Sequence, residues 1–226
     1  MRRTLFLLII GLGGAAILIS LGVWQVQRLA WKQAIIADIN ARITATPVTL
    51  PETVDPLTDA YLPITADGVI EDGEIHVLVS QKDIGAGYRI IAPFQLQDGR
   101  QIMVDRGFAL TTAKDTERAL GPATVIGNLQ WPQETDGFTP APDMNANIWF
   151  ARDVGAMAAQ LQTLPILLVA RSSSLPEPGI SALPVDTARI PNDHLQYAIT
   201  WFSLAAIWLG MSLFFLRRRG ASKVES

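Results

Sequence analysis

The stretch Pro191-Asn192-Asp193-His194-Leu195-Gln196-Tyr197-Ala198-Ile199-Thr200-Trp201-Phe202, which continues in apolar residues to Leu216, decides the fold of this chain. From Leu195 to Leu216 there are 22 residues and no Asp, Glu, Lys or Arg. At about 1.5 Å per residue a helix of this length spans roughly 33 Å, enough to cross a hydrocarbon core of about 30 Å. Pro191 disfavours a helix before it. The pattern predicts a transmembrane helix over residues 194–216, and an ionisable residue at its mouth is a candidate functional site.

A second uncharged run lies near the other end of the chain, from Thr4 to Trp24, and holds 21 residues. A secretory signal peptide is the alternative interpretation, because Arg2-Arg3 precede the run. The run is longer than the usual apolar region of about 7–15 residues, and Val23-Trp24-Gln25 is too bulky for a cleavage site. We therefore predict that residues 1–24 form a retained transmembrane helix with a short cytoplasmic N-terminus.

The basic residues predict the orientation of both helices. Outside the two runs, on the terminal sides, lie Arg2, Arg3, Arg217, Arg218, Arg219 and Lys223, whereas Arg28, Lys32 and Arg189 lie near the runs on the inner side. The positive-inside rule then places both termini in the cytoplasm, with residues 217–226 as a basic tail, and residues 25–193 across the membrane. Because no long presequence precedes the first run, we expect a bacterial inner membrane protein with a periplasmic domain.

The charge of this central segment restricts its partners. Its 12 basic and 20 acidic residues give a formal charge of −8, which argues against nucleic acid or anionic lipid headgroups as its partners. The lipid bilayer is the expected partner of the two apolar runs. The chain has no cysteine, so neither disulfides nor a thiolate site is available.

The central segment reads as a helix followed by strands. Apolar residues at helical spacing and the absence of a breaker before Pro47 predict that residues 25–45 extend the first helix. Strands are then expected at residues 64–70, 75–80, 87–97, 100–108, 123–131 and 165–171, with a hairpin turn at Asp98-Gly99 and a short helix at 153–161. The predicted fold class is membrane α+β: two transmembrane helices flank one β-rich domain, a compact mixed sheet or partly open barrel with one or two short helices.

The inventory of catalytic groups is small. The two histidines, the lack of cysteine and the absence of hydrolase or metalloprotease motifs argue against an enzyme. Scattered methionines without cysteine also argue against copper delivery. His76 lies in an alternating segment and is interpreted as a half-exposed strand residue.

His194 has informative neighbours. Tyr197, Trp201 and Trp208 follow at i+3, i+7 and i+14, on the same helix face. The positive helix N-terminus favours a neutral imidazole, which is an axial ligand for haem iron, and the aromatic side chains could pack against the macrocycle. Arg28 and Lys32, at the same membrane level, could pair with propionates. The alternative is an interfacial histidine above ordinary Tyr and Trp membrane anchors.

Five segments carry a resemblance to a known family: Leu21-Gly22-Val23-Trp24-Gln25-Val26-Gln27-Arg28-Leu29-Ala30-Trp31-Lys32, Gly87–Phe94, Val104–Phe108, Trp149–Val154 and Pro191–Phe202. In this order they resemble the surfeit-locus family of cytochrome c oxidase assembly proteins. The resemblance covers about residues 21–216. Departures are small, such as Asp193, Asp105 and Phe108 where the family often has Asn, Asn and Trp.

The resemblance implies a non-enzymatic membrane assembly factor that binds haem a and assists its insertion into subunit I of the oxidase, with haem a synthase as a candidate partner. It assigns the axial ligand to His194. The candidate cofactor-binding residues at the two helix mouths are His194, Tyr197, Trp201, Arg28, Trp24 and Gln25. A structural chaperone of the oxidase subunit without haem binding remains the alternative.

Overall fold

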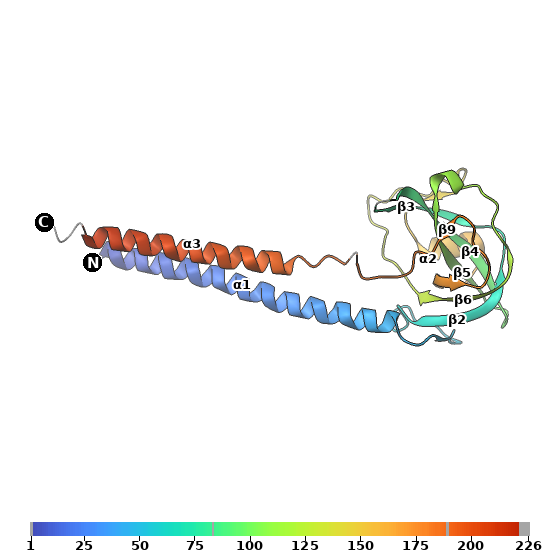
Figure 1. The fold of residues 1–226 in the computed structure, drawn as a ribbon, viewed down its shortest axis with the longest axis horizontal. Helices are drawn as coiled ribbons and strands as arrows, with labels where there is room; N and C mark the ends of the chain where they lie inside the picture. The colour runs from blue at the N-terminus through green and yellow to red at the C-terminus, as the bar shows by residue number, and fades with distance from the viewer. Residues whose placement is uncertain (1, 83, 189, 222–226) are drawn as a thin grey trace. The chain divides into compact units, whose positions relative to one another are not determined.

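The computed structural model describes residues 2–82, 84–188 and 190–221. It divides into two compact units, one containing the two long helices and the other formed by Ile39–Asp186 (Figure 1). Each unit is built by a different pattern of apolar residues.

The first unit contains helix α1 (Arg2–Ile43) as far as Asp38, together with helix α3 (His194–Ala221). α3 begins at His194, as predicted, and the backbone N–H of Tyr197 donates to the oxygen of Asp193 in its first turn. α1 passes through Trp24 without a break, because no proline follows until Pro47. Segments Leu5–Ile43 and His194–Arg218 are long and apolar enough to cross a membrane.

The second unit is a mixed nine-stranded sheet. Its strands are β1 (Val48–Thr49), β2 (Pro63–Ile70), β3 (Ile75–Gln81), β4 (Gly85–Leu96), β5 (Gln101–Leu110), β6 (Gly121–Leu129), β7 (Ile148–Trp149), β8 (Leu167–Ser173) and β9 (Ile180–Ser181). The 3-10 helix η1 (Thr111–Ala113) follows β5, and helix α2 (Val154–Leu161) precedes β8. The longer strands and α2 lie where the sequence predicts them. The two-residue strands β1, β7 and β9 were not predicted, since two residues carry no alternation.

Five strands close into a barrel in the order β2-β6-β8-β5-β4, because β2 pairs with β4 as well as with β6. The closing contact joins Gly68 to Leu96 and Ile70 to Phe94. Gly68 permits it, since a Cβ atom there would lie 2.4 Å from the backbone oxygen of Gln95. The sequence prediction allowed a partly open barrel, and the structure closes it.

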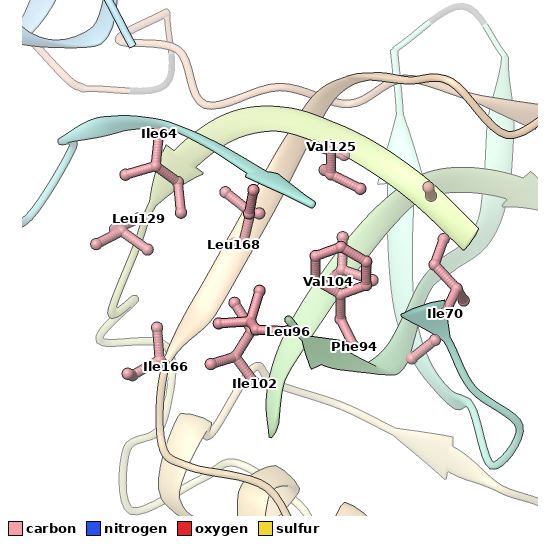
Figure 2. Close-up of a cluster of buried hydrophobic side chains, with 14 residues drawn as sticks. Ile64, Ile70, Phe94, Leu96, Ile102, Val104, Val125, Leu129, Ile166 and Leu168 are labelled. Atoms are coloured by element: carbon pink, nitrogen blue, oxygen red, sulfur yellow. The ribbon is translucent and has the colours of Figure 1, made fainter. Parts of the chain in front are cut away.

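Alternating residues of the barrel strands pack in two separate hydrophobic clusters. One face of β4, β5 and β8 points into the barrel, where a cluster of buried side chains fills the interior (Figure 2). Phe94, Val104 and Leu168 belong to this interior cluster. Ile91 and Met103, from the opposite faces of the same strands, pack in a second cluster with Met157 of α2 and Trp149. The period of two in the sequence therefore produces a barrel with an outer helical cover.

Local signals position the connections. Asp98-Gly99 forms the predicted β4–β5 turn, where Gly99 takes a φ of +88° and Asp98 accepts a 2.9 Å hydrogen bond from the N–H of Arg100. Helix α2 begins after Asp153, whose carboxylate accepts from the N–H of Ala156 at 3.0 Å.

Candidate functional site

The two long helices contact each other along stripes of small residues. Between Leu5 and Asp38 of α1 the buried positions are Gly11, Ala15, Gly22 and Gln25, at spacings of four, seven and three residues. Such spacing keeps one helix face against an antiparallel partner. A Cβ atom at Gly22 would lie 2.7 Å from the ring of Phe202, so the helix backbones approach closely there.

At one end of this contact His194 meets Gln25. The imidazole Nδ1 and the amide Oε1 are 2.8 Å apart. Gln25 is only 8% exposed, whereas His194 is half-buried. The first residue of α3 is therefore in contact with the last buried position of the α1 stripe. The two helix ends that the sequence predicts on one side of the membrane meet at these two residues.

The aromatic residues that follow His194 do not act as one surface. Trp201 is half-buried, but Tyr197 is 55% exposed. Trp208 packs its indole on α1 and donates to the backbone oxygen of Gly11 at 3.0 Å. Of the predicted aromatic stripe, Trp208 therefore serves helix packing, while Tyr197 presents its ring to the surroundings.

Trp24 and Arg28, which flank Gln25 in α1, are also exposed. Trp24 is 51% exposed, and the guanidinium of Arg28 lies 4.1 Å from the ring centroid of Trp31. This cation–π contact orients Arg28 along the helix surface and leaves its N–H groups available to an anion. The structure places Trp24 and Arg28 on the same helix as Gln25 but outside the buried stripe.

These residues fit a haem better than a bare metal ion. Within the described residues, no group of three or more His, Cys, Asp or Glu side chains gathers to hold a metal. A haem brings four of its own iron ligands, so one imidazole with planar and apolar neighbours is sufficient. The exposed rings of Trp24 and Tyr197 supply such neighbours, and Arg28 supplies donors for a propionate.

A buried ion network in the barrel unit was missed by the sequence reasoning. Asp105 is fully buried and contacts Arg89 at 2.5 Å and Arg152 at 3.9 Å. Arg152 also binds Glu134 at 2.5 Å. Burial raises the pKa of Asp105, while the two guanidinium groups oppose the shift. The sequence signal for this network was the presence of Arg89, Asp105 and Arg152 in the family-like segments at 87–94, 104–108 and 149–154.

A third buried arginine, Arg106, lines a cavity of about 340 Å³ bounded by β5, β8 and the segment after β8. Arg106 donates to both oxygens of Glu177, at 2.9 and 2.5 Å, and to the oxygen of Ala119. Its charge is therefore compensated within the domain.

His76 is buried, contrary to the half-exposed position expected from its strand. Its Nε2 lies 2.6 Å from Glu74, which also pairs with Arg118. The Glu74 carboxylate joins His76 to Arg118, so the second histidine belongs to an ion cluster of the barrel unit.

The fold and this site define a class: two antiparallel helices of membrane-spanning length and composition, a closed β-barrel unit in the chain between them, and one imidazole tied to the neighbouring helix. The chain belongs to the SURF1 family, whose sequence model matches residues 12–206.

Relatives come from animals, a choanoflagellate and bacteria. The chain is 31% identical to a SURF1-like protein of Monosiga brevicollis, over 90% of this chain and 85% of the relative. It is 30% identical to Surfeit locus protein 1 of Homo sapiens, over 83% and 70%. It is also 30% identical to a SURF1-like protein of Rickettsia felis, over 84% and 87%. The resemblance drawn from the helix mouths is thus confirmed at the level of the family.

Proposed function

We propose that this protein is an integral membrane assembly factor for haem-a-containing cytochrome c oxidase, which binds haem a at His194 and assists its insertion into subunit I. The observation that carries the proposal is the placement of His194, half-buried at the start of an apolar helix and fastened to Gln25 of the other helix. Membership in the SURF1 family supports the role in oxidase assembly.

The residues around His194 have distinct roles in this proposal. His194 would supply an imidazole nitrogen to the iron, and the bound haem would supply the redox and ligand chemistry. Trp24, Tyr197 and half-buried Trp201 offer ring surface to an apolar macrocycle. Arg28 offers charged donors to a propionate at the polar boundary of the membrane.

The membrane location is supported by the surface of the helices. Leu12, Ile17, Ile199 and Ile207 are more than half exposed, which suits contact with lipid. Retention of α1 is supported by its packing, because cleavage would remove the partners of Trp208 and His194. The proposed location is the bacterial inner membrane, with both termini cytoplasmic and the barrel domain periplasmic. Haem a synthase is a candidate partner because it supplies the cofactor.

The test is the absorption spectrum of protein purified from cells that also make haem a. Wild type is expected to carry a haem a spectrum, and His194→Ala is expected to lose it. His76→Gln is the matched control, because His76 is the other histidine of the chain and is buried in the barrel unit. Equal haem content in wild type and His194→Ala would exclude the ligand, and a haem-free wild type would favour the structural chaperone.

A further inference from the structure

The contact between His194 and Gln25 indicates which nitrogen of the imidazole carries the proton. It joins the imidazole Nδ1 to Oε1 of the amide at 2.8 Å. An amide oxygen only accepts hydrogen bonds, so this contact is a hydrogen bond when the proton lies on Nδ1. A neutral imidazole has one N–H, and the lone pair is then on Nε2. Among the described residues no hydrogen bond to Nε2 is formed.

The position of Gln25 is built by the packing of the two helices. It continues the buried stripe of Gly11, Ala15 and Gly22, and Gly22 lies one turn before it against Phe202. This close approach of the helices brings the amide within reach of the first residue of α3. Trp24 and Arg28, in contrast, are exposed. Gln25 therefore faces the other helix, whereas its neighbours face the surroundings.

We propose that Gln25 is a positioning residue that holds His194 in the Nδ1–H tautomer and so presents Nε2 as the iron-binding atom. The proposal rests on the proposed haem site for its ligand, but the tautomer is a property of the protein alone. Metal-binding histidines commonly donate their second N–H to an acceptor, which fixes the ring orientation and raises ligand basicity. Gln25 supplies this acceptor from the other helix, so the ligand is oriented only when α1 and α3 are packed together.

The first experiment reads the tautomer without haem. The full chain, with ¹⁵N-labelled histidine, is studied by NMR in detergent at a pH where the imidazole is neutral, and His76→Gln assigns the two signals. Wild type is expected to show a protonated Nδ1 and an unprotonated Nε2 at His194. Gln25→Leu removes the acceptor and is expected to give a mixture of tautomers. Gln25→Glu retains an acceptor oxygen and is expected to keep the wild-type pattern. A protonated Nε2 in wild type, or an unchanged spectrum in Gln25→Leu, overturns the proposal.

The second experiment titrates haem a into the same variants. Gln25→Leu is expected to weaken binding by about 10–100-fold, the usual effect of losing such a partner. Gln25→Glu should stay within a few-fold of wild type, and Gln27→Leu, an exposed glutamine on the same helix, is the matched control. Equal affinity of Gln25→Leu and wild type overturns the positioning role. If wild type binds no haem a, the proposed function and the ligand role of Nε2 both fail, while the NMR result still decides the tautomer.

Discussion

The indole N–H of Trp208 donates to the backbone oxygen of Gly11 at 3.0 Å, and a Cβ atom at Gly14 would lie 2.5 Å from the same nitrogen. The large ring of one helix thus lies on a glycine surface of the other. Polar contacts between membrane helices stabilise them by roughly 0.6 kcal/mol on average, and the close packing of the ring on glycine adds van der Waals contact. This contact joins the helices about four turns of α3 after the His194–Gln25 pair.

Replacing Gly14 should therefore loosen the helix pair. We expect Gly14→Leu to reduce stability by about 1–3 kcal/mol, because the rigid indole must move to admit the new side chain. The measurement is thermal unfolding of the detergent-solubilised chain, followed by tryptophan fluorescence. Gly13→Leu is the control, since a Cβ atom at Gly13 meets nothing within 4 Å. Equal effects of the two substitutions would contradict the packing role of Gly14.

The proposed orientation can be tested with single cysteines, because the chain has none of its own. Leu57 is 89% exposed on the barrel unit, and Leu57→Cys should react with a membrane-impermeant maleimide added to intact bacterial cells whose outer membrane is permeabilised. Ser226→Cys, at the opposite end of the predicted topology, should react only after the inner membrane is disrupted. Labelling of both residues, or of Ser226→Cys alone, while the inner membrane is intact would contradict the proposed topology. The cysteine-free parent measures the background labelling.

Asp105 should be one of the least tolerant positions of the barrel unit. Asp105→Ala leaves Arg89 and Arg152 without their shared buried partner, and breaking a buried pair in this way costs about 3–5 kcal/mol. The free energy of unfolding in urea measures the effect. Asp115→Ala, at an exposed residue paired with Lys114, is expected to leave stability close to that of wild type. A double variant, Arg89→Met with Asp105→Leu, should recover part of the loss, and no recovery would mean that the cost is steric.

Glu134 predicts a dependence of stability on pH. Burial opposes ionisation of this carboxyl, but the hydrogen bonds and charge of Arg152 outweigh it and lower the pKa below 4.5. A lowered folded-state pKa means that the stabilisation is complete above about pH 4.5 and is lost as the pH falls through the folded-state value. Glu134→Gln should therefore be less stable than wild type at neutral pH, by about 1 kcal/mol for this partly exposed carboxylate.

The measurement for Glu134 is the free energy of unfolding of both proteins at several pH values between neutral and acidic. The difference should narrow below pH 4.5, whereas Glu52→Gln, at an exposed position, should follow wild type throughout. A difference between Glu134→Gln and wild type that stays constant with pH would show that the Arg152 ion pair does not contribute through charge.

Much of the fold was predictable because the signals are local. The two uncharged runs define α1 and α3, the alternation defines β2 to β6, and Asp98-Gly99 defines one hairpin. Closure of the barrel through Gly68 and Leu96 was not predictable, since it depends on the relative tilt of strands that are distant in the sequence. The ion network around Asp105 was missed for the same reason: Arg89, Glu134 and Arg152 come from separate elements.

The sequence by itself determined that His194 begins an apolar helix, because that conclusion needs only composition and length. It also identified Trp24, Gln25 and Arg28 as the residues at the corresponding end of the first apolar run. Only the tertiary structure distinguished among these three, because helix packing turns one face of α1 toward α3. Gln25 falls on that face and meets the His194 Nδ1, while Trp24 and Arg28 fall outside it. The residue with the least conspicuous chemistry is therefore the one that orients the histidine.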